Sequence, residues 1–224
     1  MITTIESALA FVEAVFGRLE PGDAVEESAM VSAEARLGVK LPHALRMLYR
    51  ASGASQALHH AHNQLLAPAK VDFAANHLVF YEENQGVVVW GIARDRLAEM
   101  DPPVEQGQLD SRTGEWTFYP EFGSVSEFVA AQCAWQAVQG GLAYVGSKVH
   151  GDASDEPVSV FEAGLGTAIL VTASMRAWLV DGGVATKAGE MLGLATREPR
   201  QFEAASLRLG IAIDDWDYAT ISDE

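Results

Sequence analysis

Two short apolar runs separated by a polar turn constrain the fold of this chain more than any other feature. The runs cover residues 78–81 and 87–90, and both are rich in β-branched and aromatic side chains. Residues 83–86 between them are polar and end in Gly86, which can adopt a positive φ. The pattern predicts an antiparallel hairpin whose second strand reaches Ile92. Because consecutive residues are apolar, both faces of these strands are expected to be covered.

Helical patterns come before this hairpin. Ile5, Leu9, Val12 and Phe16 recur at helical spacing, and Gly17 follows them as a stop signal. Two further helices are predicted over residues 32–37 and from residue 42 to about residue 52. Gly38 and Pro42 are expected to form the tight break between these two helices.

The remainder of the chain gives weaker patterns. Residues 116–119 predict a strand and residues 124–139 a helix with a serine cap. Beyond them we expect strands over residues 143–148, 158–162 and 167–172, and helices over residues 173–180, 185–194 and 199–209. The order predicts an α+β fold, in which N-terminal helices pack on a largely antiparallel central sheet and further helices lie toward the C-terminus.

The charge of the chain restricts its partners. Lys plus Arg number 15 and Asp plus Glu number 31, so the formal net charge is −16. Such a protein repels phosphate backbones and anionic lipid, and we therefore expect neither a nucleic-acid nor a membrane partner. A basic protein partner is favoured instead, because opposite fields steer encounter. The alternative explanation is that the negative charge only keeps the protein soluble.

Candidate chemical groups are few. His59, His60 and His62 have a spacing that can bind a metal, but nothing marks a third ligand, so surface histidines are the alternative that we favour. Cys133, the single cysteine, excludes an intrachain disulfide and lies in a predicted helix, where a buried thiol is expected. We therefore expect no metal, no cofactor and no enzymatic activity. The first residues lack a basic segment before an apolar run, so a cytoplasmic location is expected.

Two stretches of the sequence carry a family resemblance. The first is AEARLGVKLPHALRMLYR at residues 33–50, closed by Gly53, and the second is FYEENQGVVVWG at residues 80–91. Together with the DPPV stretch at residues 101–104, they resemble the SUKH superfamily, which includes a yeast cell-wall regulator and many bacterial immunity proteins. The resemblance covers residues 1–140 as a core, and residues 141–224 are expected to be a C-terminal extension packed on the same domain.

The resemblance implies a binding function. Bacterial members bind and neutralise a cognate toxin, often a nuclease, so it implies a toxin-neutralising immunity protein with a basic partner. A housekeeping scaffold, as in the eukaryotic branch, is the alternative, and a hydrolase that uses the histidines is the third. Gly38, Pro42, Trp90 and Gly91 are expected to be structural, with Trp90 as a buried anchor on a central strand.

Two acidic patches are candidate partner-binding surfaces. In the first, Asp214, Asp215 and Asp217 surround Trp216, and an aromatic ring among carboxylates is typical of interfaces. The second combines four residues of the hairpin turn and the following loop, namely Glu82, Glu83, Asp101 and Glu105. The alternative is that the first patch is a solvated tail and the second an ordinary polar turn.

Overall fold

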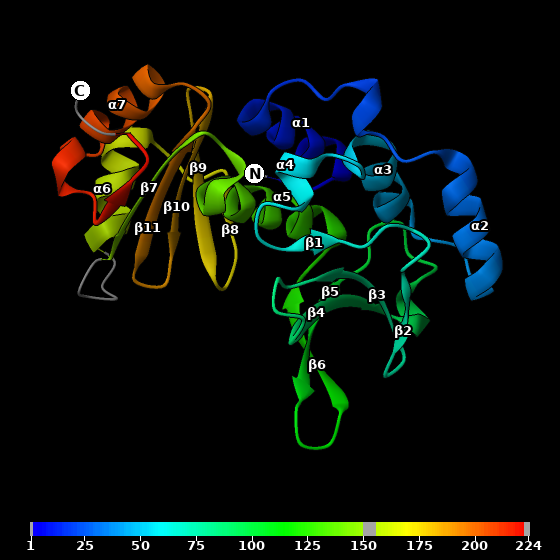
Figure 1. The fold of residues 1–224 in the computed structure, drawn as a ribbon. Helices are drawn as coiled ribbons and strands as arrows, with labels where there is room; N and C mark the ends of the chain where they lie inside the picture. Colours follow the sequence, from blue (N-terminus) through cyan, green and yellow to red (C-terminus); the bar gives the residue numbers. More distant parts are fainter. Residues whose placement is uncertain (1, 150–155, 222–224) are drawn as a thin grey trace. The chain divides into compact units, whose positions relative to one another are not determined.

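The computed structural model describes residues 2–149 and 156–221, without the side chains of residues 156–160, and the fold is α+β (Figure 1). Its residues group into two compact units. The N-terminal unit contains Thr3–Leu9 and Leu19–Val129, and the C-terminal unit contains Ala10–Arg18 and the chain from Ala130 onward. The SUKH-like core over residues 1–140 and the extension over residues 141–224 are defined by resemblance rather than by packing, so that division stays a prediction.

The helices that precede the first sheet follow the predicted order. They are α1 (Ile5–Phe16), the 3-10 turn η1 (Pro21–Asp23), α2 (Glu27–Leu37), α3 (His43–Ser52) and the single turn α4 (Gln56–His59). Gly38 ends α2 in the left-handed region, with φ +67°, and its N–H donates to the carbonyl of Glu34 at 2.9 Å. Pro42 is buried and immediately precedes α3. The predicted break between the two helices is confirmed, although α2 begins five residues earlier than its apolar pattern indicates.

The first sheet lies in the N-terminal unit and is antiparallel throughout, with strand order β1-β3-β4-β5-β6 and β2 paired to β3. Its strands are β1 (Gln64–Leu65), β2 (Asp72–Ala74), β3 (His77–Glu82), β4 (Val88–Ala93), β5 (Val104–Asp110) and β6 (Glu115–Phe122). The predicted hairpin is confirmed, because β3 pairs with β4 and Tyr81 lies opposite Trp90. Gly86 supplies the positive φ of the turn, at +71°.

Aromatic side chains form the centre of the N-terminal unit. The ring of Phe128, in α5 (Val125–Gln136), lies 5.2 Å from that of Phe80, 5.1 Å from that of Tyr81 and 5.9 Å from that of Trp90. Phe122 adds a fourth contact at 5.4 Å. Only 6% of Trp90 is exposed, so the predicted core anchor is confirmed. The serine cap of α5 is also confirmed, since the hydroxyl of Ser124 accepts the N–H of Glu127 at 3.0 Å.

The C-terminal unit contains a second antiparallel sheet, with order β12-β7-β11-β10-β9-β8. Its strands are β7 (Tyr144–Val149), β8 (Leu170–Val171), β9 (Met175–Val180), β10 (Gly183–Ala188), β11 (Met191–Thr196) and β12 (Tyr218–Ala219). One face packs on α6 (Glu156–Leu165) and α7 (Pro199–Arg208), around the buried rings of Trp178 and Phe202 (Figure 1). The π-helical turn η3 (Ala137–Gly141) packs on the other face.

Several predictions for this part of the chain are wrong. Residues 173–180 and 185–194 were expected to be helical, but they belong to β9, β10 and β11, which are buried on both faces and therefore lack polar alternation. Residues 158–162 were expected to be a strand and lie in α6. The strand over residues 143–148 and the helix over residues 199–209 are confirmed as β7 and α7.

Within residues 2–149 and 156–221, no helix is long and apolar enough to cross a lipid bilayer.

Truncation of Trp90 tests its role as the anchor of the aromatic cluster. We expect Trp90→Ala to lower the free energy of unfolding by about 3–5 kcal/mol, because it leaves a cavity against Phe128 and Tyr81. Trp116→Ala on β6 removes the same side chain from a half-exposed position and serves as the control. Urea unfolding at neutral pH measures both, and a loss below about 1 kcal/mol for Trp90→Ala would contradict the anchor role.

Candidate interaction surface

The two sides of the first sheet carry different side chains. Helices α3 and α4 lie on one side of it (Figure 1), which is also the side of the Phe128 cluster. Strand register places two rows of residues on the opposite side. We call this side the outer face, and its rows are Val79–Gly91–Glu105–Pro120 and Glu82–Val89–Gly107–Phe118.

Phe118 lies flat across the outer face. Its ring stacks on the imidazole of His77, with centroids 3.8 Å apart and an interplanar angle of 7°. Two glycines make this possible: a Cβ at Gly107 would lie 2.7 Å from the Phe118 ring, and a Cβ at Gly91 would lie 3.3 Å from it. The expected close approach beside Gly91 is therefore present, and its neighbours are Phe118 and His77.

The imidazole of His77 also joins a polar contact on this face. Its Nε2 lies 3.0 Å from Oε2 of Glu105, and its Nδ1 lies 2.9 Å from the carbonyl oxygen of Ala75. Both ring nitrogens therefore lie within hydrogen-bond distance of an oxygen atom of this chain. Glu105, predicted as a partner-binding residue, already contacts His77 of the same chain.

The other predicted residues near the hairpin are not gathered into one patch. Glu82 and Glu83 are half-exposed, and the carboxylate of Glu83 accepts the N–H of Gln85 at 2.9 Å. Asp101 has a structural role, because its carboxylate accepts the N–H of Ser126 at 3.0 Å and the hydroxyl of Ser126 at 2.6 Å. It thereby satisfies the N-terminus of α5, so only Glu82 and Glu83 remain as surface carboxylates of the turn.

The predicted C-terminal patch is also rearranged. The Trp216 ring is 6% exposed and packs against Phe202 in the core, while its Nε1 donates to the hydroxyl of Ser206 at 2.8 Å. This indole is buried within its own unit and is not presented to a partner. Asp214 and Asp215 are exposed, whereas the carboxylate of Asp217 accepts the N–H of Val149 at 2.6 Å. Tyr218, 58% exposed, is the aromatic side chain that reaches the surface here.

The three histidines lie in different environments. His59 is 3% exposed, its Nε2 lies 3.2 Å from the hydroxyl of Ser52, and burial lowers its pKa to about 3. His60 is exposed, and Nδ1 of His62 lies 3.2 Å from the side-chain amide of Asn84. Among the described residues, no three His, Cys, Asp or Glu side chains are grouped so that they could hold a metal ion. The Ser52–His59 pair is too deeply buried to meet a substrate, and Cys133 is buried in α5 with a raised pKa.

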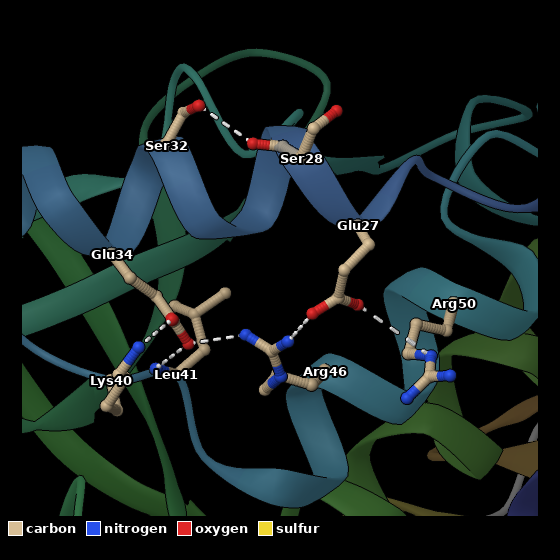
Figure 2. A network of polar contacts seen from close by, with 8 residues as sticks. All are labelled: Glu27, Ser28, Ser32, Glu34, Lys40, Leu41, Arg46 and Arg50. Atoms are coloured by element: carbon tan, nitrogen blue, oxygen red, sulfur yellow. Dashed lines mark hydrogen bonds and ion pairs between the residues drawn. The ribbon is translucent and has the colours of Figure 1, made fainter.

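A polar network that the sequence did not indicate holds α2 against α3 (Figure 2). The carboxylate of Glu34 is buried and accepts bonds from Lys40 Nζ at 2.8 Å, from the N–H of Leu41 at 3.1 Å and from Arg46 at 2.6 Å. Burial opposes ionisation, but these three donors outweigh it and lower the pKa of Glu34. The glutamate lies within the first SUKH-like stretch, and no local pattern in that stretch marks its carboxylate as buried.

Glu27 extends this network at the surface. Its carboxylate contacts Arg46 and lies 3.9 Å from Arg50 (Figure 2). An open depression of about 440 Å³ adjoins the pair and is lined by residues 24–27 and Arg50. Its charged lining residues Glu27 and Arg50 are exposed and pair with each other, so the depression does not form a preorganised ligand site.

Comparisons with known proteins returned no match: no protein-family model, no curated protein and no solved structure is similar to the chain. The SUKH resemblance therefore rests on the two sequence stretches and stays a prediction.

Replacement of Glu34 tests the network between α2 and α3. Its pKa in the folded protein is lowered, so the carboxylate stabilises the fold above the pKa of an unfolded glutamate, about 4.3, and the stabilisation is lost as the pH falls through the folded-state value. We expect Glu34→Gln to lower the free energy of unfolding by about 1–3 kcal/mol at neutral pH. The difference from the wild type should shrink in acid.

Glu27→Gln is the matched control for this experiment. Its side chain is 53% exposed, and an exposed ion pair contributes less than about 1 kcal/mol. Urea unfolding curves at several pH values compare the two variants. Equal losses for both, or a loss at Glu34 that does not change with pH, would contradict a stabilising role for the buried carboxylate.

Proposed function

We propose that this chain is a SUKH-type immunity protein that binds a basic bacterial toxin, such as a nuclease, in a stoichiometric complex in the cytoplasm. On this proposal the chain neutralises the toxin by occupying its surface and performs no chemistry of its own. The proposal rests on the resemblance at residues 33–50 and 80–91 and on the distribution of charge over the first sheet.

The charge of the first sheet is the observation that carries the proposal. Residues 72–122 contain 10 Asp and Glu against 3 Lys and Arg, a net charge of −7. The three basic side chains are already engaged: Arg94 lies over the ring of Phe73, Arg96 pairs with Glu99, and Arg112 lies 3.9 Å from Asp110. The sheet thus presents a negative field, which accelerates encounter with a positively charged protein.

The outer face supplies the other component of a protein interface. Phe118 and Trp116 are half-exposed on β6 and contribute the apolar area of this face, whereas Val79 and Val89 are buried. Aromatic area bordered by carboxylates suits a partner that combines apolar contacts with basic side chains. An acidic protein of this kind would be poorly suited to bind nucleic acid directly, because phosphate backbones are also negative.

The experiment that tests the proposal is protection from the product of a neighbouring gene. An immunity protein is encoded beside its toxin, and co-expression should restore growth of cells that the toxin kills. The purified pair should co-elute at a 1:1 ratio. A neighbouring gene without toxicity, or toxicity that co-expression does not relieve, would favour the housekeeping scaffold instead.

Neutralisation of surface carboxylates tests the contribution of charge to toxin binding. We expect Glu82→Gln with Glu83→Gln, or Asp214→Asn with Asp215→Asn, to slow association with the toxin by about 2–10-fold at low salt. The salt dependence of the association rate should weaken, while the free energy of unfolding should remain nearly unchanged. Asp217 is left intact because it accepts the Val149 N–H.

Surface plasmon resonance across a salt series gives these association rates. The pair of variants also separates the two patches, because they lie in different units of the chain. Unchanged rates for both variants would exclude both patches from the toxin-binding surface.

A further inference from the structure

A β-bulge determines where the side chain of Glu121 lies. In the pairing of β5 with β6, Val104 lies opposite Phe122 and Glu105 lies opposite Pro120, so Glu121 is the extra residue between the two pairs. Strict alternation would place Glu121 and Phe122 on opposite sides of the sheet. Glu121 instead contacts Trp90, and Phe122 contacts Phe128, so the bulge directs both toward the aromatic side.

The carboxylate of Glu121 has an unusual set of neighbours. Its Oε2 accepts the indole N–H of Trp90 at 2.7 Å. The residue is half-buried, and burial raises its pKa, although the bond from Trp90 opposes this. Among the described residues, no Lys, Arg or His forms an ion pair with it. A partly desolvated carboxylate without a cation is stabilised when a partner supplies one.

Glu121 lies on the longest strand edge that the structure describes. Strand β6 has eight residues and pairs only with β5. The other strands that pair with a single neighbour at an edge of either sheet have only two or three residues each, and they are β1, β2, β8 and β12. Pro120 lacks an N–H and the bulge follows it, so the unpaired backbone of β6 that can accept an extended segment by strand addition runs from Glu115 to Tyr119. Tyr119, on the same strand, is 50% exposed and offers apolar area beside the edge.

Charge selects the kind of partner that could occupy this edge. Glu115 and Glu121 lie near the two ends of β6, and the strand contains no Lys or Arg. A second copy of the chain would bring the same two carboxylates together along the edge, and like charges repel. A segment with Arg or Lys side chains would be attracted.

We propose that Glu121 is the anchor for a basic side chain of a protein partner that docks along the outer edge of β6. The inference deepens the proposed immunity function, on which it rests, because it assigns the partner-facing surface and the residue that recognises the cation. The indole of Trp90 holds one carboxylate oxygen, and the other oxygen remains available to a guanidinium or ammonium group.

A short arginine peptide with blocked ends is the probe that tests this site without the toxin. Fluorescence anisotropy of the labelled peptide gives its Kd, and the ¹⁵N-indole resonance of Trp90, assigned through its loss in Trp90→Phe, reports on the Glu121 contact. We expect the peptide to shift this resonance in the wild type. Glu121→Gln should raise the Kd by about 10-fold, as expected for loss of a charge-assisted contact.

Glu115→Gln on the same strand is the matched control and should raise the Kd by less than about 2-fold. Glu121→Gln keeps an oxygen that can accept the Trp90 N–H, so an indole resonance at its folded position shows that the variant retains the fold. Equal loss in both variants, no loss in either, or no shift of the Trp90 resonance would overturn the anchor. A rise in molecular mass on sedimentation, with no dependence on the peptide, would assign the edge to a second copy and would also overturn it.

Binding experiments with the toxin distinguish a failure of this inference from a failure of the proposed function. Toxin binding that is unaffected by Glu121→Gln would refute the anchor and leave the immunity function standing. Failure of every neighbouring gene product to bind would refute the immunity function, while the peptide experiment would still decide whether Glu121 recognises a basic side chain.

Discussion

Packing of Phe128 against four aromatic rings is the contact on which the N-terminal unit depends. Phe80 and Tyr81 are consecutive on β3, yet both rings contact Phe128, because the register of β3 with β4 shifts between Val79 and Tyr81. An unbroken strand would direct one of the two rings to the outer face. The bulge therefore concentrates aromatic area on the side where α5 packs and so increases the apolar surface that folding removes from water.

The same arrangement explains the outer face of the sheet. With the large rings of β3 and β4 directed toward α5, the outer face retains Val79, Val89 and two glycines in its central rows. The glycines leave a shallow strip without side chains, and Phe118 from β6 fills it and reaches His77 on β3. A single ring thus spans the sheet, which couples the edge strand to the central hairpin.

The sequence predicted the parts of this structure that depend on local patterns. The β3–β4 hairpin, the turn at Gly86, the break at Gly38 and the burial of Trp90 follow from runs of apolar residues and from glycine chemistry. The second sheet was missed because β9 to β11 are rich in Ala, Leu and Met, which favour helices when the tertiary context is unknown. The Asp181-Gly182 pair between β9 and β10 is a hairpin signal that could have corrected this reading.

Prediction of surface residues depended on information that local patterns do not contain. Trp216 was expected at an interface because carboxylates flank it, but its ring is buried against Phe202, since neighbours in sequence do not determine which side chain faces the core. Asp101 and Glu105 were predicted as partner-binding residues, and each is bonded to a residue of the same chain, Ser126 and His77. Glu121 was not singled out, because a bulge is a property of strand register, which the sequence of β6 does not specify by itself.

The positions of the basic side chains determine which acidic residues of the chain are left without a nearby cation. In the α2–α3 network, Glu34 and Glu27 are compensated by Lys40, Arg46 and Arg50, which are basic residues of the same segment. Among residues 72–122, by contrast, Arg96 and Arg112 pair with residues near them in sequence and Arg94 lies over Phe73. Glu121 has an indole N–H as its donor. At moderate ionic strength, salt screens the interaction between exposed charges that are more than about 10 Å apart, but it screens a half-buried carboxylate much less. The attraction of Glu121 for a cation would therefore persist at ionic strengths that weaken the attraction of Glu82 and Glu83, so the exposed charges would act mainly on encounter and the half-buried one on the lifetime of a complex.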